Sequence, residues 1–222
     1  MGIAIYKYKI NFDFFNNKKE KYWYFIGFIA SDGYISDDKI EIALNMKDEY
    51  MIKNFRDLIC PDKPVYYKPK TNSVRFTIHS KEIAKEFKKI FSLTSNKKHD
   101  EMKFPKVPKR YLKDFLRGYI DGDGSICKAK GYQVVNGNKK TYIGIRLRIL
   151  GNYDFLKRMT ELIRNEIPNK TFSISKRKNE NVYEVTYNFS IAEAILHWIY
   201  DDNLICLKRK EEKFIYLLNN KE

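Results

Sequence analysis

Two segments of this chain share one pattern and lie nearly half the chain apart. Residues 27–33 read GFIASDG, and residues 118–124 read GYIDGDG. Each has a glycine, an apolar stretch, an aspartate and a final glycine, which indicates a helix that ends at a carboxylate. The repeat predicts an internal duplication in which two paired helices bring Asp32 and Asp123 together.

The order of the expected elements repeats after each of these helices. Alternating apolar residues predict strands, and apolar stripes at helical spacing predict helices. In the first half, the strands are expected at 39–46, 65–70 and 74–79 and the helices at 48–59 and 81–91. In the second half, the strands are expected at 142–150, 172–176 and 183–189 and the helices at 154–166, 192–200 and 208–219. We therefore expect an α+β fold with a first half at 1–92, a connector at 93–107 and a second half at 108–222.

The glycines of the two motifs also carry information. Gly27 and Gly118 fall in mid-helix, where glycine costs up to ~1 kcal/mol relative to alanine. A close crossing of the two helices explains why glycine stands there. Gly33 and Gly124 suit the left-handed conformation that ends many helices. An insert at 128–140 contains an Asn-Gly pair, which predicts a hairpin turn.

The charge of the chain favours a polyanionic partner. The net charge is +15, from 43 Lys and Arg against 28 Asp and Glu. Such an excess on a folded chain is typical of nucleic-acid binding, and a lysine-rich solvated surface is the alternative. The three cysteines and three histidines are scattered, so we expect neither a zinc site nor a disulfide framework.

No segment predicts export or membrane insertion. No apolar run approaches the ~20 residues of a membrane span, and the N-terminal residues lack the pattern of a signal peptide. We expect an intracellular protein, located in the cytoplasm or nucleoid or in an organelle, with no membrane partner.

Strand alternation predicts one apolar and one polar face for each sheet. The polar face is expected to bind nucleic acid, because Arg, Lys and Thr side chains contact bases and phosphates. The candidate residues for DNA binding are Arg75, Thr77, His79, Lys70, Arg146, Arg148, Lys178 and Lys128. An ordinary solvated sheet face is the alternative.

The two motif aspartates predict a metal site. Helix C-termini carry partial negative charge, so two carboxylates there repel unless a cation lies between them. Mg²⁺ prefers such oxygen ligands beside phosphate and supports phosphodiester hydrolysis. A calcium loop starting at Asp121 is excluded, because Ile126 and Tyr132 stand where glycine and glutamate are required.

Residues 25–33 (FIGFIASDG) and 116–124 (LRGYIDGDG) resemble two copies of the LAGLIDADG motif. The chain is similar to the single-chain, two-motif homing endonucleases from about residue 15 to residue 220. The first copy departs from the motif at Ala30, where the pattern has an acidic residue, and at Ser31.

The resemblance implies a tandem pseudo-twofold repeat of αββαββα halves, whose two central helices pack together and whose antiparallel sheets form a DNA-binding saddle. It also implies an intron-encoded monomer that cuts both strands of a long, pseudo-palindromic DNA site with Mg²⁺, for which Mn²⁺ substitutes. In this reading Asp32 and Asp123 bind the metals, with Ser31 and Gly122 beside them. The basic side chains near the metals would be Lys47, Lys68 or Lys70, and Lys176 or Lys178.

Two other functions stay open at this point. A protein of the same fold could bind DNA or RNA without cutting, as an intron RNA maturase does. A basic α+β scaffold with two ordinary Asp-Gly turns would bind no nucleic acid and would tolerate loss of either aspartate.

Overall fold

The computed structural model describes residues 7–95, 98–168, 173–178, 182–200 and 205–220. The first half contains the elements α1 (Phe12–Asn16), α2 (Glu20–Asp32), β1 (Gly33–Ile35), β2 (Lys39–Asn45), η1 (Met46–Asp48), α3 (Glu49–Ile59), β3 (Tyr66–Lys68), η2 (Pro69–Thr71), β4 (Ser73–His79) and α4 (Lys81–Phe91). After α5 (Lys98–Glu101), the second half contains η3 (Lys109–Tyr111), α6 (Leu112–Asp123), β5 (Gly124–Val135), β6 (Asn138–Gly151), α7 (Tyr153–Glu166), β7 (Ile174–Lys176), β8 (Tyr183–Asn188), α8 (Phe189–Tyr200) and α9 (Lys208–Asn219).

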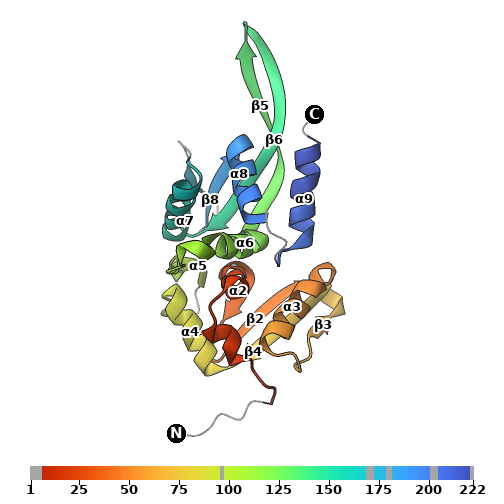
Figure 1. Cartoon of the computed structure of the whole chain (residues 1–222), viewed down its shortest axis with the longest axis vertical. Helices are drawn as coiled ribbons and strands as arrows, with labels where there is room; N and C mark the ends of the chain where they lie inside the picture. The colour runs from red at the N-terminus through yellow and green to blue at the C-terminus, as the bar shows by residue number, and fades with distance from the viewer. Residues whose placement is uncertain (1–6, 96–97, 169–172, 179–181, 201–204, 221–222) are drawn as a thin grey trace.

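Each half builds one four-stranded antiparallel sheet. The strand order is β1-β2-β4-β3 in the first half and β5-β6-β8-β7 in the second, which is the same arrangement. The α+β fold and the tandem repeat predicted from the sequence are therefore confirmed. Figure 1 shows the halves stacked along the long axis, with α2 and α6 packed together between them.

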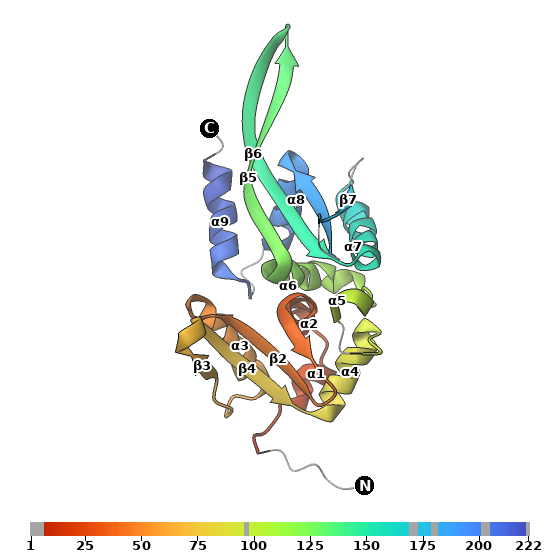
Figure 2. The same cartoon turned by 180° about the vertical axis from the view of Figure 1, so that it is seen from behind.

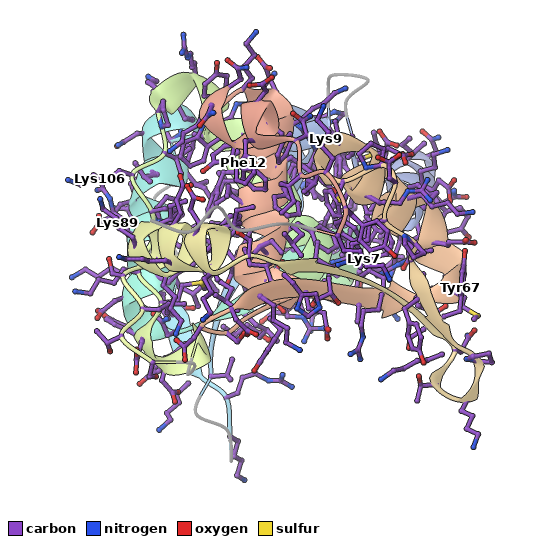
Figure 3. All side chains as sticks on the ribbon, turned by 90° about the horizontal axis from the view of Figure 1, so that it is seen from below. Lys7, Lys9, Phe12, Tyr67, Lys89 and Lys106 are labelled. Atoms are coloured by element: carbon purple, nitrogen blue, oxygen red, sulfur yellow. The ribbon has the colours of Figure 1, made fainter. Side chains whose placement is uncertain are left out.

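Within the described parts of the chain, the helices cover one face of each sheet and leave the other face uncovered (Figure 1 and Figure 2). Seen from behind, the uncovered faces of both sheets are turned toward the same side of the molecule (Figure 2). Seen along the long axis, β2 and β4 run below α1 and α3, and Tyr67 marks the β3 end of the first sheet (Figure 3). In that view Lys89 and Lys106 lie at the other side of the molecule. The two uncovered faces thus lie on one side of the molecule, as a saddle requires (Figure 2).

The crossing of α2 and α6 depends on two glycines. A Cβ added to Gly27 would lie 2.0 Å from the carbonyl oxygen of Phe115, and a Cβ on Gly118 would lie 2.0 Å from that of Tyr24. The two backbones are in direct contact at both points, as the sequence predicted. The contact is symmetric, because each glycine meets the other helix one turn before that helix's own glycine.

The glycines that follow the two aspartates correct one prediction. Gly33 has φ −78° and ψ 149°, and Gly124 has φ −77° and ψ 142°, so both are extended rather than left-handed. Each helix passes directly into a strand. Glycine is required there for space, because an added Cβ would lie 2.7 Å from the carbonyl oxygen of Ile29 or 2.5 Å from that of Ile120.

The insert at 128–140 forms the outer part of a long hairpin. β5 and β6 pair from Gly124 and Ile149 outward to Val135 and Asn138, and the hairpin projects beyond the body of the second half. The predicted Asn-Gly turn is confirmed, with φ of 52° and 77° at residues 136 and 137. In the first half, β1 has only three residues, so the hairpin is a feature of one half.

Among the described residues, no helix has both the length and the apolar character that a membrane crossing needs.

Candidate functional site

The two motif helices end side by side. α2 ends at Asp32 and α6 ends at Asp123. A Cβ added to Gly122 would lie 1.9 Å from Oγ of Ser31 and 3.4 Å from the carboxyl carbon of Asp32. The last turns of the helices therefore touch, and the missing side chain at position 122 leaves room for the Asp32 carboxyl group.

The charges of both aspartates affect the pKa values of the same two buried side chains. Asp32 is exposed and Asp123 is half-buried, so both are within reach of a ligand. Burial raises the pKa of the Tyr119 phenol, and the charges of Asp123 and Asp32 raise it further. The same two charges also act on the ammonium group of Lys210. The structure thus places the two carboxylates in one small region, as the repeat predicted.

This donor set fits a hard divalent cation. Among the described residues, no group of three or more His, Cys, Asp or Glu side chains is arranged to hold a metal ion. Mg²⁺ does not need such a group, because it commonly takes one or two protein carboxylates and completes its shell with water and phosphate oxygens. Asp32 and Asp123 provide those carboxylates at helix ends, where the helix dipoles also favour a cation.

Lys210 is a basic residue at this site that is not among the residues predicted from the sequence. It lies in the first turn of α9 and is 7% exposed. Its Nζ donates to the carbonyl oxygens of Ile120, at 2.7 Å, and Gly122, at 2.8 Å, in the last turn of α6. Burial lowers its pKa to about 8, although the nearby carboxylates oppose that change. An ammonium group therefore lies directly behind the paired aspartates.

A signal for Lys210 exists in the sequence. In the run KRKEEKFIYLL, Lys210, Phe214 and Leu217 lie on one face of a helix, and all three are buried. A lysine on an apolar stripe is unusual and indicates a buried acceptor for its ammonium group. Only the fold shows that the acceptors are the carbonyl oxygens at the end of a motif helix.

Asp121 holds α9 in this position. Its carboxylate accepts hydrogen bonds from Tyr24 Oη (2.7 Å), Tyr200 Oη (2.6 Å) and the backbone nitrogen of Leu207 (2.7 Å). Burial raises the pKa of Asp121, and the three donors oppose that rise. The carboxylate therefore joins α2, α6, α8 and the start of α9 in one buried network.

The same network distinguishes the two motif helices from each other. Asp121 corresponds to Ala30, and Tyr24 corresponds to Phe115 in the other motif helix. Neither Ala30 nor Phe115 carries a polar group, so the bond between Asp121 and Tyr24 has no counterpart on the other side. Position 30 therefore has no carboxylate to accept a hydrogen bond, and position 115 has no hydroxyl to donate one.

Replacing Asp121 by alanine should lower the free energy of unfolding by about 3–5 kcal/mol, because three buried donors lose their acceptor. Urea denaturation followed by circular dichroism measures this change. Asp62→Ala is the matched control, since Asp62 is exposed in a turn. An Asp121→Ala variant as stable as the control variant would contradict the role of this network.

Contacts with the first half also fix the start of α9. Nε of Arg209 donates to the buried carboxylate of Asp48 at 2.9 Å, and the Tyr50 hydroxyl accepts from the backbone nitrogen of Lys208. Arg117 donates to the carbonyl oxygen of Ile205 at 3.0 Å, just before the helix. Both halves of the chain therefore position the helix that carries Lys210.

A polar cluster lies on the uncovered face of the first sheet. Arg75 Nη1 is 3.0 Å from Glu41 Oε1, and Thr77 Oγ1 donates to Glu41 Oε2 at 3.0 Å. Lys39 Nζ lies 4.0 Å from the same oxygen, and His79 pairs with Lys39 across the two strands. Arg75, Thr77 and His79 thus share one face as predicted. The carboxylate of Glu41 among them was not predicted.

Arg146 and Arg148 share the uncovered face of the second sheet. Nε of Arg146 donates to Oδ1 of Asn188 at 2.8 Å. Nη2 of Arg148 lies 3.7 Å from Sγ of Cys127, which raises the pKa of this guanidinium group. Both arginines therefore have neighbours on adjacent strands while remaining on the face that no helix covers.

Two predicted lysines lie on the other face of the second sheet. Lys128 pairs with the buried Ile145, and Lys176 pairs with Tyr183, on the helix-covered side. Opposed residues of antiparallel strands point to the same face, so these lysines do not belong to the surface formed by Arg146 and Arg148. A role of Lys128 in DNA binding stays a prediction.

The other predicted lysines are exposed or half-buried at the ends of strands. Lys68 ends β3 on the uncovered face, whereas Lys70 lies in η2, because Pro69 ends the strand. Lys178 lies in a turn after β7, and Lys47 lies in η1. A catalytic role for Lys47, Lys68 or Lys176 stays a prediction.

Comparison with known proteins gives a likeness of structure. No protein-family model and no curated protein matches the sequence. The structure is similar to the I-SmaMI LAGLIDADG homing endonuclease bound to cleaved DNA, with a TM-score of 0.59 and 12% identity over 89% of this chain and 87% of that chain. It is similar to the LAGLIDADG meganuclease I-AabMI bound to uncleaved DNA, with a TM-score of 0.55 and 16% identity over 89% and 90% of the two chains.

A third similar structure is the I-LtrWI LAGLIDADG homing endonuclease bound to target DNA. Its TM-score is 0.54, with 15% identity over 94% of this chain and 91% of that chain. The likeness spans both halves of the chain. This chain therefore has the two-domain fold of the LAGLIDADG homing endonucleases.

Proposed function

We propose that this protein is a site-specific endonuclease that cleaves double-stranded DNA with Mg²⁺. One observation carries the proposal: two accessible carboxylates, Asp32 and Asp123, meet at the ends of paired helices between two uncovered polar sheet faces. The net charge of +15 and the DNA bound in structures of the same fold support it. One chain supplies both aspartates and both sheets, so we propose that it acts as a monomer on a pseudo-palindromic site.

Each part of the site has a separate task in this proposal. The uncovered sheet faces bind the duplex on either side of the helix pair and place the scissile phosphates at Asp32 and Asp123. These carboxylates would hold Mg²⁺ or Mn²⁺, which when bound supplies an activated water and neutralises charge on the phosphate. The buried ammonium group of Lys210 offsets part of the negative charge at the helix ends.

Lys210→Met should reduce the rate of DNA cleavage about 100-fold or more while changing DNA affinity little, because the substitution removes the positive charge that offsets negative charge at the end of α6, beside the proposed metal carboxylates. Single-turnover cleavage and a binding titration in Ca²⁺ measure the two effects. Lys213→Met is the matched control, since Lys213 is exposed on the same helix. Equal cleavage by both variants would remove Lys210 from the catalytic site.

The proposed function is tested by incubating the purified protein with a randomised double-stranded DNA library in Mg²⁺ and sequencing the cut ends. Discrete double-strand cuts at one recurring site support the proposal. Selective retention of DNA without cutting would replace it by a DNA-binding protein of the same fold. Selective retention of RNA instead would indicate a maturase.

A further inference from the structure

The two sheets correspond to each other position by position. Asp32 and Asp123 end their helices at the same place, and the next residues pair as Gly33 with Ile42 and Gly124 with Ile149. Each position on the uncovered face of one sheet therefore has a defined counterpart on the other. In a symmetric protein–DNA complex such counterparts would meet the same base pair of the two half-sites.

This correspondence relates two sets of cross-strand neighbours. In the first sheet, Glu41 is opposite Thr77, and Ala43 is opposite Arg75. In the second sheet, the register places Arg148 opposite Thr186 and Leu150 opposite Glu184. Glu41 thus corresponds to Arg148, Thr77 to Thr186, and Arg75 to Glu184.

The two charges are exchanged between the halves. The central strand carries the carboxylate of Glu41 in the first half and the guanidinium of Arg148 in the second. The next strand carries the guanidinium of Arg75 in the first half and the carboxylate of Glu184 in the second. The threonine is conserved between the sheets, and its hydroxyl donates to the carboxylate in both, at 3.0 Å and 3.1 Å.

These side chains are not needed for the core. They lie on the face that no helix covers, and the buried residues of the same strands point the other way. Nε of Arg75 and Nε of Arg148 are shielded and have no hydrogen-bond partner among the described residues. An arginine with such an unpaired donor gives up fewer hydrogen bonds within the protein when it turns toward a ligand.

We propose that Glu41 with Arg75, and Arg148 with Glu184, make the protein read different base pairs at twofold-related positions of its target. The inference rests on the proposed function, since it needs DNA on both uncovered faces. A guanidinium donates to guanine N7 and O6, whereas a carboxylate accepts from the amino group of cytosine. The exchange therefore disfavours a target that is palindromic at this position.

The test is selection from a randomised double-stranded DNA library in Ca²⁺, followed by sequencing of the bound fraction. The natural protein is compared with the exchange variant Glu41→Arg/Arg75→Glu, which gives the first sheet the charge order of the second. Lys18→Glu/Glu86→Lys is the matched control, because it reverses an ion pair of 3.1 Å in which neither residue lies on a sheet strand. Circular dichroism establishes that each variant is folded.

The natural protein should select a target in which one pair of twofold-related positions carries different preferred bases, each favoured about tenfold or more over the base preferred in the other half. The exchange variant should shift the first-half preference toward that of the second half at that position alone, and the control should select the natural target. Equal preferences in the two half-sites of the natural protein would overturn the inference while leaving the proposed function intact. So would an unchanged preference in the folded exchange variant. Selection of no DNA sequence would overturn both.

Discussion

Asp32→Asn and Asp123→Asn should each reduce double-strand cleavage by about 1,000-fold or more, while the affinity for the selected DNA stays within a few fold. Asparagine keeps the size of the side chain but removes the negative charge that a divalent cation needs. Loss of several kcal/mol of transition-state stabilisation corresponds to such a rate change. Cleavage of a supercoiled plasmid carrying the target separates nicking from double-strand cutting, and a binding titration in Ca²⁺ gives the affinity.

Asp62→Asn is the control for these variants, because Asp62 is an exposed turn residue. It should cut at the natural rate. Full activity of either motif variant would show that its aspartate does not hold a required metal. Loss of binding together with cleavage would instead show that the aspartates serve the fold or the DNA contact.

Gly27→Ala and Gly118→Ala should each lower the free energy of unfolding by about 3 kcal/mol or more, or prevent folding. The added Cβ would lie 2.0 Å from a carbonyl oxygen of the facing helix, and neither backbone can yield without separating α2 from α6. The higher helix propensity of alanine recovers only ~1 kcal/mol of this. Urea denaturation of the purified variants measures the change.

Gly137→Ala provides a comparison for backbone strain alone. Gly137 has φ +77° and no atom within 4 Å of its added Cβ, so the variant should lose only about 1 kcal/mol. If the Gly27→Ala variant were nearly as stable as the natural protein, the helices would not cross as closely as the structure shows.

Much of this fold is encoded in local sequence patterns. The motif helices, the close crossing at Gly27 and Gly118, and the two-face alternation around Arg75 and Arg146 follow from spacing that the sequence displays directly. The duplication added a second, independent copy of each pattern. These features depend on residues that are near one another in the chain or repeat at a fixed distance.

The rest depends on contacts between distant segments. Lys210 meets the end of α6 and Asp121 meets Tyr24 only after the two halves have packed together, so no local pattern identifies either pair. The face on which Lys128 lies also depends on the pairing of β5 with β6, because a shift of one residue in register reverses the face of every side chain in a strand. Glycine is required at positions 33 and 124 because a Cβ would clash with the preceding helix, not because φ is positive. That clash depends on the folded backbone and cannot be inferred from the composition.

The most direct test of the metal centre is a crystal structure of the protein with its selected DNA and Mn²⁺, whose anomalous scattering locates the ion. We expect an anomalous peak about 2.0–2.2 Å from a carboxylate oxygen of Asp32 or Asp123, beside a phosphate of DNA that lies along both uncovered sheet faces. A peak elsewhere, or DNA bound away from the ends of α2 and α6, would contradict this expectation.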